Sequence, residues 1–201
     1  MKKYIYIVLV LAFANLSCTV YQTAVNASRL KFKLDKVDNY TVCGIPIEGK
    51  TSIRDFSPLE MLKITGNTLK KRFPVSFILN VSAKNPNDST GGYPRTDIIL
   101  KSFPFKLFID DKETIEGNIN GPVAVPGTGE IVNIPVRIDV DLFKFFGDKD
   151  YKALVNLAFA IAGSNGYSST IKLYAHPTVT TPLGDITYPG EIKILSKEFS
   201  N

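Results

Sequence analysis

The feature that most constrains this chain is the alternation of apolar and polar side chains between Pro74 and Asn87. Every second residue is apolar, which is the period of a β-strand with one face buried in a core. The inward set is Val75, Phe77, Leu79, Val81 and Ala83, and the outward set is Ser76, Ile78, Asn80, Ser82 and Lys84. The run stops at Asn85-Pro86-Asn87, because Pro86 has no N–H for a strand ladder. We therefore expect a strand of a β-sandwich that enters a turn.

The same alternation recurs along the chain and predicts a mainly β fold with an immunoglobulin-like or fibronectin-III-like sandwich. Val37 interrupts the period after the first strand, and Pro135 inside a later one favours an edge strand. The further extended stretches are residues 30–34, 40–47, 103–109, 132–140, 171–175, 178–183 and 191–195. No internal repeat or linker divides residues 30–199, so we expect a single domain there.

Two helices are predicted to pack on the sandwich. The first begins with Ser57 as N-cap, Pro58 at the first helical position and Glu60 closing a capping box, and it runs to about Lys70. Its side chains expected to face the core are Leu59, Leu62, Ile64 and Leu69.

The second helix, Tyr151–Ala162, ends at Gly163 and is apolar over more than half of its circumference. A helix on a sandwich needs only one apolar face, so the excess must be covered. We expect residues 142–146 and the first helix to cover it, which buries Leu154 and Phe159. A bound ligand or a second protomer is the alternative cover.

The N-terminus has the composition of an export signal. Basic residues at Lys2 and Lys3 precede an apolar run over residues 4–14, which is shorter than the roughly 20 residues of a membrane-spanning helix. Cys18 then follows Ser17, an arrangement that resembles a bacterial lipobox. The resemblance implies a signal peptide over residues 1–17, lipidation of Cys18 and a tether over residues 18–29. Ordinary signal cleavage nearby and an uncleaved anchor are the alternatives.

The residue after the lipidated cysteine is Thr19, not the aspartate that resembles an inner-membrane retention signal. The resemblance therefore implies an outer-membrane lipoprotein on the periplasmic face of a Gram-negative envelope. The net charge of +5 falls to +3 without Lys2 and Lys3, and the remaining basic residues are scattered along the chain. Because no basic stripe gathers them, we expect no nucleic-acid partner.

Several short motifs suggest chemistry without supporting it. Residues 44–51 match the P-loop spacing, but Pro46 lacks the N–H that a phosphate cradle needs, so no nucleotide is expected. Asp148 and Asp150 resemble the opening of a calcium loop, yet Ala153 and Phe159 replace its glycine and glutamate, so no metal is expected.

Three residues remain as candidates for chemistry or modification. Cys43 and the single histidine, His176, could form a nucleophile pair, although no spacing supports it. No disulfide is expected, because the other cysteine is Cys18. Ser89 lies in a turn-rich stretch and is a candidate O-glycosylation acceptor, with an ordinary turn as the favoured interpretation.

An ordered set of features resembles the late-embryogenesis-abundant type 2 domain, also called the water-stress and hypersensitive-response domain, in its bacterial lipoprotein form. The set is Cys18, the Ser57–Glu60 helix start, Asn85-Pro86-Asn87, Gly117, Val125-Pro126-Gly127, Ile134-Pro135-Val136, the late apolar helix and Thr181-Pro182-Leu183-Gly184. The resemblance implies a sandwich of about seven strands, with no catalytic residues and no cofactor. A link to stress protection would be an analogy of fold alone.

The sequence thus predicts a non-enzymatic, lipid-anchored binding or structural module of the cell envelope. Its expected partners are the membrane, through Cys18, and an envelope protein or apolar ligand. One alternative is a carrier of a lipid or other apolar ligand, with residues 142–162 as one wall. A hydrolase built on Cys43 and His176 is the less favoured alternative.

Overall fold

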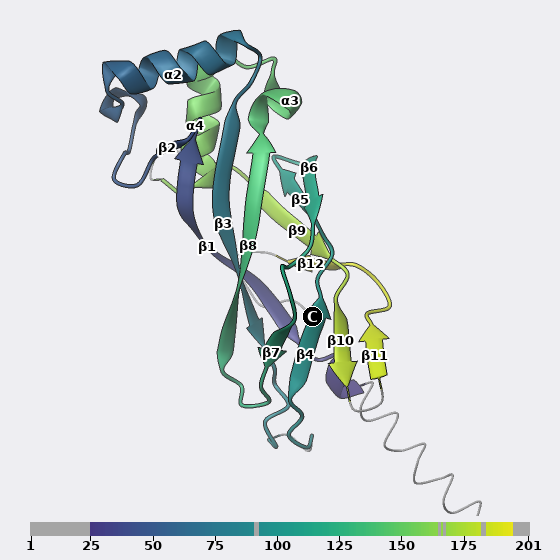
Figure 1. The fold of residues 1–201 in the computed structure, drawn as a ribbon. Coiled ribbons are helices and arrows are strands. Elements are labelled where there is room, and N and C mark those ends of the chain that lie inside the picture. The colour runs from purple at the N-terminus through teal and green to yellow at the C-terminus, as the bar shows by residue number, and fades with distance from the viewer. Residues whose placement is uncertain (1–24, 91–92, 165, 167, 182–183, 195–201) are drawn as a thin grey trace, which may run out of the picture.

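The first layer of the fold is a four-stranded antiparallel sheet built around three long strands (Figure 1). Its strand order is β2-β1-β3-β8. The strands span Lys31–Val42 (β1), Ile45–Pro46 (β2), Pro74–Lys84 (β3) and Ile131–Asp141 (β8). They belong to a computed structural model, which describes residues 25–90, 93–164, 166, 168–181 and 184–194 of the chain.

The second layer consists of two four-stranded antiparallel sheets joined end to end. Their strand orders are β12-β9-β5-β6 and β11-β10-β4-β7. The strands are β4 (Ile98–Ser102), β5 (Phe105–Ile109), β6 (Lys112–Gly117), β7 (Val123–Val125), β9 (Ile171–Ala175), β10 (Thr178–Thr181), β11 (Gly184–Thr187) and β12 (Ile192–Ile194).

The chain crosses between the two sheets of the second layer four times, each time through a segment that contains proline. Pro104 separates β4 from β5, Pro122 separates β6 from β7, Pro177 separates β9 from β10, and Pro189 separates β11 from β12. Proline has no backbone N–H, so the ladders are interrupted at this level. The His176 N–H donates to the Pro104 carbonyl at 2.9 Å and links two neighbouring breaks.

The two layers bury one continuous apolar core, which confirms the predicted β-sandwich. All five inward residues assigned to the strand after Pro74 are buried, and so are Phe103, Phe105, Leu107 and Ile109 of the opposite layer. The rings of Phe32 and Phe103 meet across the interface with centroids 5.2 Å apart. The alternation therefore assigned the core-facing side chains correctly in both layers.

The outward assignment of the same strand was wrong at two positions. Asn80 and Ser82 are only 3% and 6% exposed. They are covered because β3 is a central strand, with β1 and β8 paired along both of its edges. The Asn80 amide donates to the Lys36 carbonyl at 3.1 Å and to the Asp38 carboxylate at 2.7 Å, and it accepts a bond from Asn133.

The predicted extended stretches 30–34 and 40–47 are not separate strands. β1 runs from the first into the second, and β2 lies at the end of the second. β1 is continuous over 12 residues, with register shifts between Leu34 and Val37 and between Asp38 and Thr41. The interruption of the sequence period at Val37 reflects the first of these irregularities. β8, which carries Pro135, lies at the edge of its sheet as predicted.

Apart from residues 25–27, which are helical at the opposite end, the helices gather at one end of the sandwich (Figure 1). They are the 3₁₀ helix η1 (Ile53–Asp55) and the α-helices α2 (Pro58–Leu69), α3 (Leu142–Phe146) and α4 (Tyr151–Ile161). The predicted capping box of α2 is present. Ser57 Oγ accepts from the Glu60 N–H at 3.3 Å, and Glu60 Oε2 accepts from the Ser57 N–H at 2.7 Å.

Helix α4 is enclosed by neighbours on several sides, as expected from its excess of apolar residues. It packs against α2, α3, η1 and β1. Leu154 and Phe159 are buried, and the Phe159 ring meets the Phe56 ring with centroids 6.0 Å apart. Residues 142–146 and the first helix therefore supply much of the cover, which confirms the prediction.

The predicted core face of α2 was wrong. Leu59, Leu62 and Leu69 are 79%, 69% and 86% exposed, and Ile64 is the only fully buried residue of this helix. The helix rests on α4 through the side that carries Ile64 and the half-buried Met61. Because Leu59, Leu62 and Leu69 lie on the opposite side of the helix, they point to solvent.

Candidate functional site

A cleft of about 390 Å³ opens between β1 and the C-terminal end of α4. Its position follows from the irregularity in β1, where Leu34 pairs with Val81 and the next paired residue is Val37. The lining residues come from both layers and from α4: Leu34, Asp35, Lys36, Val37, Leu79, Ala160, Ile161, Ala162, Gly163, Ser169 and Ile171.

The cleft has an apolar floor and a polar mouth. Leu34, Leu79 and Ile161 are buried, whereas Asp35 and Lys36 are exposed. Its volume is near the lower limit of small-molecule sites. The arrangement suits an apolar or amphipathic group whose polar end reaches the carboxylate and the ammonium at the rim.

Sequence reasoning located one wall of this cleft and missed the other. The C-terminal part of α4 belongs to the 142–162 segment proposed as a carrier wall. Asp35, Lys36 and the supporting Asn80 were not recognised. The only sequence signal for them was the break of the period at Val37.

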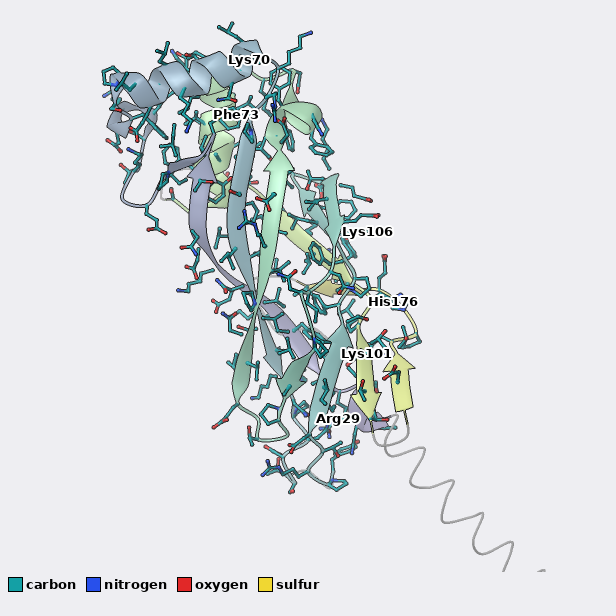
Figure 2. The ribbon with its side chains drawn as sticks, in the orientation of Figure 1. Arg29, Lys70, Phe73, Lys101, Lys106 and His176 are labelled. Carbon is teal, nitrogen blue, oxygen red and sulfur yellow. The ribbon has the colours of Figure 1, made fainter. Side chains whose placement is uncertain are left out.

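At the end of the sandwich opposite α2, the start of the described chain is hydrogen-bonded to the Asn85–Asn87 turn. Figure 2 labels Arg29 at this end. The side-chain amide of Asn87 donates to the Asn26 carbonyl at 2.8 Å and accepts a bond from Arg29 Nη1 at 2.9 Å. The Arg29 guanidinium also lies 3.6 Å from the centre of the Tyr93 ring. We call this end, with residues 25–29 and 85–87, the base.

The tether assigned to residues 18–29 is therefore too long. Ala27 is buried, and its carbonyl accepts a bond from the Tyr188 hydroxyl at 2.8 Å. Residues 25–29 are part of the folded domain, because the Asn87 amide and the Tyr188 hydroxyl find their partners there. Cys18, the candidate lipidation site, lies outside the described residues.

The structure does not bring Cys43 and His176 together. Cys43 is buried in the β1–β2 turn of the first layer, and burial raises the pKa of its thiol to about 11, so the nucleophilic thiolate is scarce at neutral pH. His176 lies in the second layer at the break between β9 and β10 (Figure 2), where its Nε2 is 2.6 Å from the Tyr188 carbonyl. The nucleophile pair considered from the sequence is not formed.

The remaining motifs have structural roles. Gly44 is in the β1–β2 turn with φ of 70°, and Lys50 of the P-loop-like stretch pairs with Glu60 at 3.2 Å. Asp150 is the N-cap of α4, where it accepts from the Ala153 N–H at 2.8 Å. Ser89 is exposed in its turn, and its hydroxyl accepts from the Arg95 N–H at 3.2 Å.

Within residues 25–90, 93–164, 166, 168–181 and 184–194, no group of three or more His, Cys, Asp or Glu residues is placed to hold a metal ion. In that same part of the chain, no helix has the length and apolarity needed to span a bilayer.

Comparison with known proteins gives no family. No model of a known protein family matches the sequence, and no curated protein matches it either. Among solved structures, the fold is similar to a solution structure of a protein from Arabidopsis thaliana, with 16% identity, a TM-score of 0.35, and coverage of 84% of this chain and 83% of that one. A crystal structure of a protein from Archaeoglobus fulgidus matches with 11% identity, a TM-score of 0.30, and coverage of 62% and 87%.

Proposed function

We propose that this protein is a non-catalytic, lipid-anchored module of the cell envelope, with the sandwich held through Cys18 on the periplasmic side of an outer membrane. The proposal includes membership of the late-embryogenesis-abundant type 2 family, which the sequence motifs resemble. The observation that carries it is the attachment of residues 25–29 to Asn87 and Tyr188 at the base. Only residues 19–24 separate Cys18 from this attachment, so the base would face the membrane and the helical end would face away.

This proposal is tested by changing Cys18→Ser. We expect the wild-type protein to fractionate with membranes and to carry the mass of acyl chains on its N-terminus. The variant should be released or remain unprocessed, because the thiol that accepts the lipid is missing. The matched control is Cys43→Ala, which changes the only other cysteine and should leave fractionation unchanged. A membrane-bound Cys18→Ser protein and a wild-type N-terminus without acyl mass would contradict the proposal.

The second candidate function is that of a carrier for an apolar ligand, and the cleft beside β1 is the observation that favours it. Its test is titration with the apolar fluorescent probe anilinonaphthalene sulfonate. Because Leu154 and Phe159 are already covered by protein, we expect only weak binding. Ala162→Phe would fill the cleft, whereas Asn156→Phe adds the same ring at an exposed position of α4 and serves as the control.

Strong, saturable probe binding that is lost in Ala162→Phe and kept in Asn156→Phe would favour the carrier. Native mass spectrometry of protein purified from its own membranes would then look for the retained molecule.

A further inference from the structure

The outer side of α2 is an apolar surface without cover from the described residues. Leu59, Leu62 and Leu69 expose 79%, 69% and 86% of their area and recur at helical spacing along one side. Gly66 lies between them, and the space around the position of its missing side chain is open for at least 4 Å. We call this surface the leucine ridge.

Basic side chains border the leucine ridge. Lys63 and Lys70 lie on the helix beside it, and Lys71 and Arg72 follow directly, all four exposed. Between residues 54 and 72 the chain carries five basic and two acidic side chains.

Both carboxylates of this region have partners away from the leucine ridge. Asp55 accepts bonds from the N–H groups of Thr51 and Ser52, and Glu60 accepts from Ser57 and pairs with Lys50. The ridge is therefore bordered by positive charge alone.

The shape of this surface favours a bilayer over a protein partner. α2 lies across the end of the molecule, with α4 beneath it (Figure 1). Its exposed leucines therefore form a convex row on the outer side of the helix. A protein would have to supply a groove to receive such a row. A bilayer surface accepts leucine side chains among its headgroups at any position, and anionic lipids attract the lysines beside them.

We propose that the leucine ridge, with Lys70, Lys71 and Arg72, binds the surface of a bilayer rich in anionic lipid. This inference extends the proposed function, because it concerns the end of the domain that faces away from the anchor. Figure 2 shows Lys70 and Arg29 at opposite ends of the molecule. Anchor and ridge would together connect two membrane surfaces.

Chain length argues that the ridge contacts a surface other than the one that holds the anchor. Seven Cα–Cα intervals separate Cys18 from residue 25 at the base. At 3.3–3.6 Å for each interval, they span at most about 25 Å. The 11 residues of β3 alone separate the base from α2 by roughly 36 Å. Because the ridge points away from the base, it cannot reach the leaflet that holds Cys18.

The test uses the full-length lipidated protein in donor vesicles of phosphatidylcholine. Fluorescent acceptor vesicles contain phosphatidylcholine with or without phosphatidylglycerol, and capture of acceptors by donors is measured. We expect capture of the anionic acceptors only, and weaker capture as salt is raised. Leu62→Ser combined with Leu69→Ser, and Lys70→Glu combined with Lys71→Glu, should each lower capture at least about tenfold.

The chain offers matched controls at the same kinds of exposed position. Ile131→Ser removes an exposed apolar side chain from the base end of β8, and Lys193→Glu reverses a charge on β12. Both should capture acceptors as the wild type does. Gly66→Leu adds a fourth leucine to the ridge and should increase capture while its circular dichroism spectrum stays that of the wild type.

The outcomes separate this inference from the proposed anchor. Protein that stays with donor vesicles but captures no anionic acceptors overturns the inference and leaves the anchor in place. Protein that leaves the donors contradicts the anchor, and its direct binding to anionic vesicles then tests the ridge. Equal capture of neutral acceptors, unchanged capture by the leucine variants, or capture that requires envelope proteins in the acceptors would overturn the assignment to anionic lipid.

Discussion

Replacing Phe77 by alanine is expected to lower the free energy of unfolding by about 3–5 kcal/mol, the range for a fully buried aromatic ring. Phe77 is 2% exposed in the middle of β3, and its ring stacks on Tyr40 with centroids 5.1 Å apart and planes within 3°. Its neighbours belong to strands paired on both sides and cannot collapse fully into the space left behind. Urea unfolding monitored by circular dichroism measures the loss.

The adjacent polar position provides the comparison. Asn80→Ala should cost about 1–3 kcal/mol, because it removes a buried amide and with it the hydrogen bonds to the Lys36 carbonyl and to Asp38. If Asn80 were exposed on the outward face, as the alternation predicts, the same change would cost at most about 0.5 kcal/mol. A larger loss for Asn80→Ala than for Phe77→Ala would contradict the assignment of Phe77 to the core.

The second large effect is expected at Asn85, which is fully buried at the base. Its amide nitrogen donates to the carbonyls of Thr96 at 2.8 Å and Val125 at 3.0 Å. Its amide oxygen accepts from the backbone N–H of Asn87 at 3.1 Å and from the Asn87 side chain at 2.9 Å. Asn85→Ala should lower the free energy of unfolding by about 3 kcal/mol or more, because several buried groups lose their partners together.

Asn133→Ala is the control for this change. Asn133 is exposed and donates one hydrogen bond to Asn80, so its replacement should cost about 1 kcal/mol or less. Hydrogen exchange would show where the damage occurs, with residues 25–29 losing protection in Asn85→Ala and keeping it in Asn133→Ala. Protection of residues 25–29 that survives Asn85→Ala would show that the base does not depend on the Asn85 amide.

The base and the leucine ridge give the molecule two chemically different ends. At the base, buried amide groups hold the segment that follows the proposed anchor. At the other end, three leucines and a run of basic residues are exposed on a helix whose inner side is packed on α4. Between the two ends run β1, β3 and β8, each 11 or 12 residues long.

Local signals in the sequence were sufficient for the long, regular elements, but none of the predicted extended stretches covers β4, β6 or β7. The period of two located β3, β5 and β8, and the positions of Phe77 and Leu107 in the core followed from it. The start of α2 followed from Ser57 and Glu60, whose side chains bond within one helical turn. These features are predictable because the backbone geometry that produces them involves neighbours in the chain.

The positions of the cleft and of the residues at the two ends depend on contacts between distant parts of the chain. Only tertiary structure placed the C-terminal turn of α4 beside the irregular part of β1, and only strand pairing on both edges of β3 buried Asn80. The docking of residues 25–29 required partners about 60 residues away, at Asn87, and still farther away, at Tyr188. Nothing in the composition of that segment distinguished it from a tether.

Helix α2 shows most directly where the sequence stops being informative. The sequence determined that a capped helix forms and that it carries apolar residues on more than one side. Periodicity alone does not say which apolar side meets a neighbour, because burial depends on what else the fold brings there. Packing on α4 covered Ile64 and left Leu59, Leu62 and Leu69 in solvent. The element was a property of the local sequence, and its exposed surface was decided by the tertiary structure.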